Sequence, residues 1–372
     1  MIGYPSIFLD TLHPKTMTQT SHNQNAKDKP ARRPRFKRTP FASCYLKDLD
    51  IQLLRYAYTY RLLDTSHFTA LCDNHHLTIK RRLQNLYHNG YLDRPVSQLH
   101  AWTSGSRQFV YALGARGAKA LQEKGVPISE GVDWYEKNKH IKNDYIQHRL
   151  GITNFRVMLD LALRAHNPHL TLEPVAHTNS LWWEWQGGPK AQHKRPTVSF
   201  SHRSANMTAG ICPDGLFSIG QGEKSYPCFV EYDTGSMPVY RSNPNLTSIA
   251  RKFLIYWNLW DQEVQHKKRL LHTSPLKDFF DVETFRVLFI TTTPERIASM
   301  IKSCQDLFKT GRKLFWFTTF DQITLDNPQD IFKPIWYMGS TQLYNSRVES
   351  PQQTLQHSFG IEHLPQPLIH ID

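Results

Sequence analysis

A short amphipathic segment, residues 78–90, is the feature that most constrains the fold of the first third of this chain. Its apolar side chains recur at offsets of 0, 4, 7 and 8, the spacing of one helix face: Ile79, Leu83, Leu86 and Tyr87. The remaining faces carry polar and cationic side chains, and Gly90 is a typical stop after a helix. We therefore predict a helix with one buried face and one basic face.

The elements around this helix predict a winged helix-turn-helix over residues 43–128. A first helix is expected at about 47–61, and a short second helix follows with Thr65 or Ser66 as its N-cap. The segment SQLHAWTSGSRQFVYAL, residues 97–113, predicts a two-stranded wing. An ordinary solvated basic helix in a small helical domain is the alternative, and a winged helix can also contact proteins.

A recognition helix of this kind binds double-stranded DNA through two sets of side chains. Guanidinium and amide groups bond to guanine and adenine edges, while flanking cations hold phosphates. The residues predicted to contact DNA come from this helix and from the wing: Thr78, Lys80, Arg81, Arg82, Gln84, Asn85 and Arg107.

The charge balance favours a polyanionic partner. The 372 residues include 45 Lys and Arg against 32 Asp and Glu, a formal net charge of +13. Cations that neutralise phosphates release condensed counterions, which drives binding to nucleic acids. Residues 1–42 are polar and aperiodic and carry much of the surplus between 26 and 40, so we expect a flexible basic arm that lies along DNA or stays solvated.

Cysteine usage and hydropathy predict a cytoplasmic protein. The five cysteines are scattered without a CxxC pair, which argues against a disulfide framework and a cysteine-based zinc site. No apolar run is long enough to cross a membrane, and the N-terminus lacks the pattern of a signal peptide.

Residues 129–165 are expected to form a helical connector. His140, Asp144 and His148 lie four residues apart within it and share one helix face. A metal cluster is one interpretation, and a polar seam that caps packed neighbours is the interpretation we favour. Residues 341–372, rich in Gln, Ser, His and Pro, are expected to be a tail whose last residues dock on a neighbour.

Residues 166–340 alternate strand and helix patterns, which predicts an α/β sheet core. Acidic residues fall on two of the expected strands: Asp214 follows Pro213, and Glu231 and Asp233 lie on one face of the next strand. Together these carboxylates could hold Mg²⁺ or Mn²⁺, and Lys252 on the following helix could stabilise charge on a scissile phosphate. A turn or cap role is the alternative, because Pro-Asp-Gly is a turn signature.

Several segments resemble the replication-relaxation family of plasmids and mobile elements. They are YALGARGAKAL, HRLGITNFRVML, PDGLF, FVEYDTGSM and RKFLIYW, spread over about residues 46–320. The most specific is EYDTGS after the PDG strand. The resemblance implies a winged helix-turn-helix followed by a restriction-endonuclease-like core of the PD-(D/E)xK type, acting in replication, relaxation or mobilisation of plasmid DNA.

Carried over to this sequence, the resemblance makes Asp214 the first acidic residue of the nuclease motif and Glu231 the second, both metal ligands. The lysine that the motif places two residues after the second acid is absent, since Asp233 stands there. Lys252 is our candidate for a migrated replacement. Because the motif is incomplete in this way, three activities stay open for the core: it cuts DNA, nicks DNA or only binds DNA.

Three functions follow for testing. The first is a metal-dependent nickase that acts at an origin, and the second is a DNA-binding regulator of replication or transcription whose nuclease-like core is inactive. The third is an interaction protein that binds nucleic acid loosely. A covalent mechanism through Tyr232, Tyr240 or Tyr256 ranks behind hydrolysis. Plasmid replication or conjugation proteins and a second copy of the chain stay open as partners.

Overall fold

The computed structural model describes residues 36–39, 44–72, 74–98, 108–176, 180–184, 195–202, 205–309, 311–340 and 365–369. Most of the predicted arm, the wing turn with Arg107 and most of the predicted tail therefore lie outside the described residues. Contacts within Arg38–Asp372 form one compact unit.

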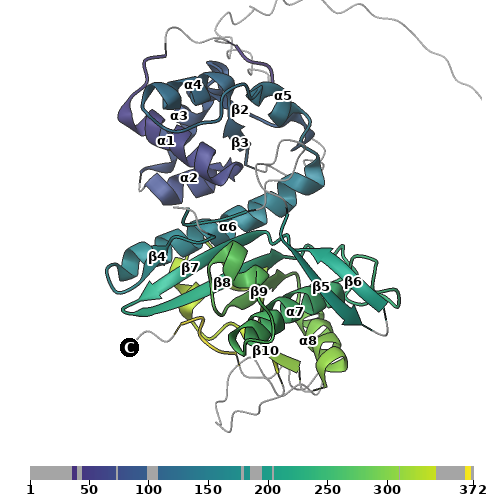
Figure 1. Cartoon of the computed structure of the whole chain (residues 1–372). Coiled ribbons are helices and arrows are strands. Elements are labelled where there is room, and N and C mark those ends of the chain that lie inside the picture. The colour runs from purple at the N-terminus through teal and green to yellow at the C-terminus, as the bar shows by residue number, and fades with distance from the viewer. Residues whose placement is uncertain are drawn as a thin grey trace, which may run out of the picture. The chain divides into compact units, whose positions relative to one another are not determined.

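The first module consists of four helices and three short strands (Figure 1). In chain order these are α1 (Asp48–Tyr60), β1 (Leu63–Asp64), α2 (Thr65–Cys72), α3 (His76–His88), β2 (Leu92–Asp93), β3 (Val110–Leu113) and α4 (Ala115–Glu123). The strands form an antiparallel sheet in the order β1-β3-β2. Three helices followed by paired strands agree with the sequence expectation, whereas the winged helix-turn-helix itself stays a prediction because the wing turn is not described.

The apolar stripe of α3 is buried as its spacing predicts. Ile79, Leu83 and Leu86 are fully buried in the module's core, together with Tyr87. The helix begins two residues earlier than expected, because the side chain of His75 accepts a hydrogen bond from the Leu77 N–H and caps it. From the arm, Arg38 packs against this module: its guanidinium donates to the Tyr87 carbonyl at 3.1 Å and pairs with Asp93.

The connector is two helices rather than one, α5 (Trp134–Lys139) and α6 (Asn143–His166). The α6 helix has two apolar faces. Phe155, Met158 and Leu159 belong to the core under the main sheet, whereas Val157 belongs to the core of the first module. The hydroxyl of Thr153 adds a hydrogen bond to the Leu62 carbonyl at 2.9 Å. The α6 helix therefore joins the first module to the sheet.

The main sheet has six strands in the order β11-β10-β9-β8-β7-β4. Their bounds are β4 (Thr171–Glu173), β7 (Gly215–Gln221), β8 (Lys224–Tyr232), β9 (Arg286–Thr291), β10 (Gly311–Thr319) and β11 (Tyr337–Ser340). The three strands β8, β9 and β10 run parallel, and the remaining pairs are antiparallel. This is the α/β sheet core that the alternating patterns predict.

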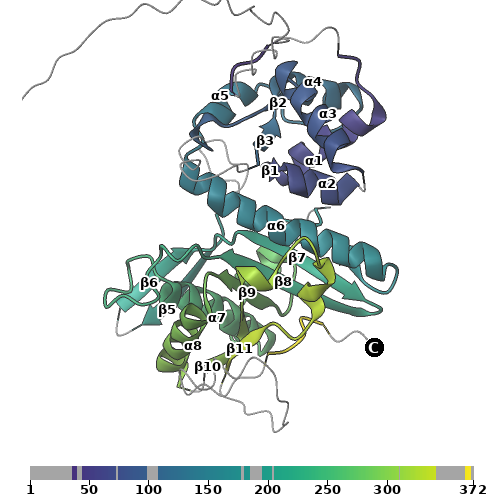
Figure 2. The same cartoon turned by 180° about the vertical axis from the view of Figure 1, so that it is seen from behind.

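Helices cover both faces of this sheet, as Figures 1 and 2 show. One face packs on α7 (Ile249–Lys267), α8 (Pro294–Phe308) and the π-helix Leu276–Phe280. The other packs on α6 and on the 3-10 helix Pro328–Phe332. Side chains that alternate along β8 reach these two cores in turn, Phe229 on the α7 face and Val230 on the α6 face.

Two segments depart from the sequence expectation. The segment between β4 and β7, which the sequence patterns did not resolve into strands, contains an antiparallel hairpin, β5 (Thr197–His202) and β6 (Ala205–Gly210), whose inward residues join the core on the α7 face. Residues 365–369, expected within a tail, return to the sheet instead. Gln366 exchanges two backbone hydrogen bonds with Trp336, and Leu368 and Ile369 are buried, so docking occurs on the chain's own core. Among the described residues, no helix combines the length and apolar character needed to cross a bilayer.

Candidate functional site

The register of β7 and β8 brings Asp214 and Glu231 to the same end of the sheet. In this antiparallel pair Gly215 faces Val230, so the residue before β7 lies beside the last residues of β8. The Asp214 N–H donates to the Val230 carbonyl at 2.9 Å, and its carboxylate oxygen Oδ2 accepts a bond from the Tyr232 N–H at 2.8 Å. Backbone pairing therefore holds the first acidic side chain.

Lys252 and Tyr256 of α7 hold the second acidic side chain. They are one helical turn apart, so both face the sheet at the same place. The Lys252 ammonium forms an ion pair with Glu231 Oε2, and the Tyr256 hydroxyl donates to Oε1 at 2.6 Å. The Glu231 side chain is only 3% exposed. The structure thus brings together three of the residues expected at the site: Asp214, Glu231 and Lys252.

Burial and neighbouring charges set the ionisation of this pair. Burial and the nearby Asp214 charge raise the pKa of Glu231 against the opposing effect of Lys252. For Lys252, burial acts to lower the pKa, but the two carboxylates outweigh it and the pKa is raised. Lys252 therefore remains a cation beside the carboxylates.

His148 of α6 completes the site, and sequence reasoning did not place it there. Its Nε2 lies 3.3 Å from Asp214 Oδ2 and 3.0 Å from the Tyr232 carbonyl. Both partners are acceptors, so this nitrogen carries a proton. The close approach of α6 to the end of β8 needs Gly151, because a Cβ there would lie 1.8 Å from the Tyr232 ring. The available signal was the HRLG segment, in which His148 stands three residues before that glycine.

Opposing effects act on the His148–Asp214 pair. For His148, burial acts to lower the pKa, but the hydrogen bond and charge of Asp214 raise it overall. For Asp214, burial acts to raise the pKa, but the hydrogen bond from His148 and the charge of Lys252 lower it overall. The predicted grouping of His148 with His140 and Asp144 does not form. Those two side chains are exposed, and no group of three potential ligands suits a metal among the described residues.

Asp233 does not join the other two carboxylates, which corrects the predicted three-carboxylate cluster. Its strand position puts it on the same face as Glu231, but Arg296 at the start of α8 pairs with it. Arg296 Nη2 donates to Oδ1 at 2.9 Å, and the Thr291 hydroxyl donates to Oδ2 at 2.6 Å. Asp233 is buried in this network and ties the end of β8 to β9 and α8.

Asp214 and Glu231 supply the carboxylate oxygens that a hard divalent cation prefers. Mg²⁺ is commonly bound through one or two carboxylates and keeps water or phosphate oxygens in its other positions. Asp214 Oδ1 accepts no hydrogen bond from the described residues, and this side chain is 19% exposed. A carboxylate offers about four lone-pair sites, so Glu231 retains acceptor capacity beside Lys252 and Tyr256. The two carboxylates could therefore hold Mg²⁺ or Mn²⁺.

The predicted DNA face of α3 is only partly free. Lys80 and Arg81 are exposed, and Thr78 and Gln84 are half-buried. Arg82 differs, because its guanidinium forms a bidentate pair with Asp50 of α1, a fully buried carboxylate. Asn85 also bonds within the module, accepting from the Asn89 amide at 2.9 Å.

The three tyrosines considered as nucleophiles do not gather as a group, and of the three only Tyr256 places its hydroxyl at the acid site. Tyr256 is buried and donates to Glu231, and burial raises its pKa well above the usual range. The Tyr232 ring stacks on Phe320 with 4.4 Å between ring centroids, and Tyr240 is exposed on the loop before α7. None is arranged as an activated nucleophile.

Comparison with known proteins gives a family match and several distant structural likenesses, of which two are described below. The sequence profile described as Replication-relaxation matches residues 54–273. The solved structures of the restriction endonuclease FokI, and of that enzyme bound to DNA, share 11% identity over 77% of this chain, with TM-scores of 0.26 and 0.24. The chain spans 45% and 46% of those structures, and at these scores neither decides the fold. No curated protein matches the chain.

Proposed function

The chain belongs to the replication-relaxation family, and from this premise we propose that it binds duplex DNA of a plasmid or other mobile element and nicks it by metal-dependent hydrolysis. The first module would select the site during replication, relaxation or mobilisation. The strand ends of the main sheet would carry the chemistry.

One observation carries this proposal. Asp214, Glu231 and Lys252 come from two strands and a helix, yet they meet at one end of the sheet. Glu231 is buried and Asp214 is half-buried beside a retained cation, and such an arrangement costs stability because each charge loses hydration. Perturbed carboxylates with a specific charged partner are typical of functional sites.

The side chains support the following division of labour. Asp214 and Glu231 would hold Mg²⁺ or Mn²⁺, which supplies polarisation of the phosphate and a more acidic bound water. Lys252 stays charged because Glu231 faces it, so it can offset negative charge that develops on the phosphate. His148 orients the Asp214 carboxylate by bonding Oδ2, which leaves Oδ1 available. Tyr256 fixes the Glu231 rotamer.

DNA binding by the first module rests on α3. Lys80 and Arg81 are exposed on the face opposite the buried stripe, where they can reach bases and phosphates without disturbing the core. Thr78 and Gln84 extend the same polar face. Arg82 and Asn85 are engaged within the module, and Arg107, which lies outside the described residues, remains a prediction.

A second function, a DNA-binding regulator without cleavage, is favoured by a different observation. Both carboxylates already have protein cations as partners, Lys252 for Glu231 and His148 for Asp214. The usual lysine position is occupied by Asp233, which is committed to Arg296. Such pairing reduces the charge that draws a metal ion to the site.

A plasmid assay separates the two functions. The purified protein is incubated with supercoiled plasmid carrying the parent element's origin, in Mg²⁺, Mn²⁺ or EDTA. We expect open-circular product that requires the metal, and we expect Asp214→Asn to abolish it while DNA binding survives. Asp326→Asn, the same change at an exposed residue, is the matched control.

The outcomes exclude each other. Metal-dependent nicking that Asp214→Asn removes and Asp326→Asn keeps supports the nickase. Site-specific binding without product in any metal supports the regulator. Nicking that continues undiminished in Asp214→Asn would remove this carboxylate from the mechanism.

A further inference from the structure

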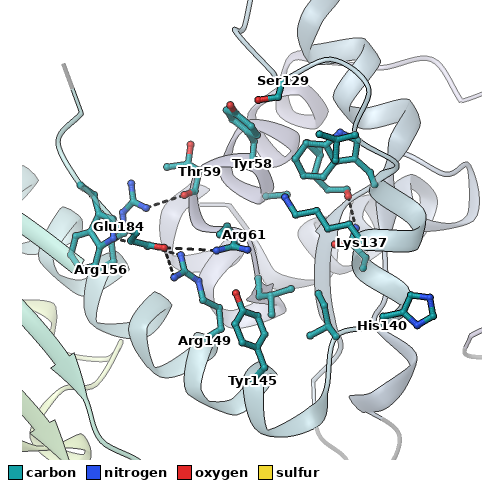
Figure 3. Close-up of a pocket in the computed structure, with 18 of the residues that line it drawn as sticks. Tyr58, Thr59, Arg61, Ser129, Lys137, His140, Tyr145, Arg149, Arg156 and Glu184 are labelled. Atoms are coloured by element: carbon teal, nitrogen blue, oxygen red, sulfur yellow. Dashed lines mark hydrogen bonds and ion pairs between the residues drawn. The ribbon is translucent and has the colours of Figure 1, made fainter. Parts of the chain in front are cut away.

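A cavity lies on the other side of α6 from the acid site. Its volume is about 760 Å³, and its walls come from the end of α1, from α5, from the first half of α6 and from residues 180–184. Figure 3 shows Lys137 and Arg61 reaching into this space from different elements, with Glu184 and the Arg149 and Arg156 side chains gathered on one side. Neither the DNA-contacting residues nor the acid site account for this cavity.

The cavity carries a surplus of positive charge. Its described lining includes five permanent cations and one carboxylate: Arg61, Lys137, Lys142, Arg149, Arg156 and Glu184. Arg149 already neutralises Glu184 through two bonds of 2.6 and 2.7 Å. Arg61 approaches the same carboxylate only at 3.9 Å. The other four cations, Arg61, Lys137, Lys142 and Arg156, therefore have no further carboxylate among the described lining residues.

Two of these cations are held in positions that favour an incoming anion. Arg61 has a φ of 70°, a backbone conformation that an arginine adopts only at a cost, and it ends α1 at the cavity. Lys137 lies over the Trp134 ring, with its ammonium 4.5 Å from the ring centroid. Burial and the positive charge of Arg61 lower the pKa of Lys137, so an anion between them would relieve their repulsion.

Aromatic side chains line the same space. Tyr58, Trp134, Tyr145 and Trp182 all contribute to its walls. Aromatic rings interleaved with cations are the means by which proteins bind unpaired nucleic acid strands, since bases stack on rings while cations follow the phosphates. A cavity of this volume falls in the range of small-ligand sites, about 300–1,000 Å³, which suits a short unpaired segment rather than a double helix.

The cavity and the acid site share structural elements. His148, which bonds Asp214, is followed on α6 by Arg149, which lines the cavity. Trp182 of the cavity wall packs against Gly215, the residue after Asp214, where a Cβ would lie 2.1 Å from the indole. A strand bound in the cavity would thus lie next to the elements that carry the two carboxylates.

We propose that this cavity binds an unpaired nucleotide segment of DNA, with phosphate oxygens on Arg61 and Lys137 and a base against the aromatic wall. The inference rests on the proposed action on DNA and deepens it, because it assigns a place to a strand that has left the duplex. A free nucleotide offers the same phosphate and base, so the experiment separates the two sources.

Fluorescence anisotropy of a labelled oligothymidylate tests the proposal with the full chain. Lys137→Glu reverses a charge that lines the cavity, and Lys224→Glu makes the same charge change at the start of β8, at the opposite end of that hairpin from the carboxylates. We expect Lys137→Glu to weaken oligonucleotide binding about tenfold and to reduce its salt dependence. We expect Lys224→Glu to bind as the wild type does.

Competitors identify the occupant. Unlabelled oligothymidylate should displace the probe, whereas thymidine monophosphate at equal nucleotide concentration should displace little if a strand is the ligand. Full displacement by the mononucleotide would assign the cavity to free nucleotides. Equal displacement by polyglutamate of matched charge would show that charge alone is recognised and would overturn the assignment, as would equal affinities of the two lysine variants.

The plasmid assay keeps this inference distinguishable from the proposed function. If nicking is absent but Lys137→Glu still weakens oligonucleotide binding selectively, the nickase fails and the strand site stands. If nicking occurs and both lysine variants bind the oligonucleotide alike, the nickase stands and the strand site fails. Circular dichroism spectra that match the wild type establish that each variant is folded.

Discussion

The carboxylates at the ends of β7 and β8 and the cations on α3 are both charged, but they are held in opposite ways. Glu231 is 2% exposed and has both oxygens bonded, whereas Lys80 and Arg81 face solvent. A buried charge is part of the packing, so replacing it changes stability and chemistry together. An exposed charge is available to a partner, so replacing it changes binding with little effect on the fold.

The comparison is tested most severely by Glu231→Ala. This change leaves the Lys252 ammonium and the Tyr256 hydroxyl without their buried partner, so we expect a loss of about 4 kcal/mol in the free energy of unfolding. Urea denaturation followed by circular dichroism measures it. Glu223→Ala, at the exposed turn of the same hairpin, should stay within about 0.5 kcal/mol of wild type. Equal losses in the two variants would contradict the buried pairing.

Adjacent arginines on α3 sharpen the comparison within one helix. Arg82→Ala would leave Asp50 as a buried, unpaired carboxylate, and we expect about 3 kcal/mol of destabilisation. Arg81→Ala removes an exposed side chain and should change stability by less than about 0.5 kcal/mol. The same denaturation measurement compares the two directly. A stability loss in Arg81→Ala as large as that in Arg82→Ala would contradict the distinction between an exposed and a buried, paired arginine.

For DNA binding we expect the reverse of the order expected for stability, because the exposed arginine matters more than the buried one. On the proposed function, Arg81→Ala should weaken binding to origin DNA by about 1–3 kcal/mol, because a bidentate base contact is lost. Gel shift titration at fixed salt measures this, with random duplex as competitor. Lys313→Ala, an exposed residue of β10, is the matched control. Unchanged affinity in Arg81→Ala would move DNA recognition away from α3.

The smallest expected effect concerns pH. Because the pKa of Asp214 is lowered, its carboxylate stabilises the fold at pH values above 3.8, the ordinary pKa of this group. This contribution is lost as the pH falls through the lowered pKa. Because the pKa of His148 is raised, its imidazolium stabilises the fold at pH values below 6.5, the ordinary pKa of this group. This contribution is lost as the pH rises through the raised pKa. The pair therefore contributes most between these two ordinary values.

His148→Gln should consequently differ from wild type most near the middle of that window and least above neutral pH. The His148 side chain is 32% exposed, so solvent screening limits the difference to about 1 kcal/mol. Denaturation curves across the pH range measure it, and His169→Gln, an exposed histidine after α6, serves as control. If the difference in the free energy of unfolding between His148→Gln and wild type grew with rising pH, the sign assigned to the His148 contribution would be wrong.

Sequence patterns were sufficient to predict the features that depend on contacts between residues close together in the chain. The buried stripe of α3, the extent of α1, the presence of a helix around Lys252 and the strands around Asp214 and Glu231 follow from residues within a few positions of one another. Even Lys252 could be chosen from sequence, because its helix follows the second acidic strand and the family motif lacks its lysine.

Other features could not be chosen in this way. His148 meets the Tyr232 carbonyl across 84 positions of sequence, and Asp233 meets Arg296 across 63. The hairpin β5–β6 was hidden because only one of its faces is apolar and the segment before it is polar and basic. The buried pair Leu368 and Ile369 lies beyond a polar stretch that resembles a tail.

By itself the sequence determined most of the helices and strands, the faces of them that are apolar and the side chains that carry charge. Helical and strand periodicities depend on neighbours a few residues away, so these properties are present in the chain before it folds. The tertiary structure alone decided which charges are paired, because strand register and helix packing choose partners that are distant in sequence. That choice separated Asp233 from the other acids, placed His148 beside Asp214 and committed Arg82 to Asp50.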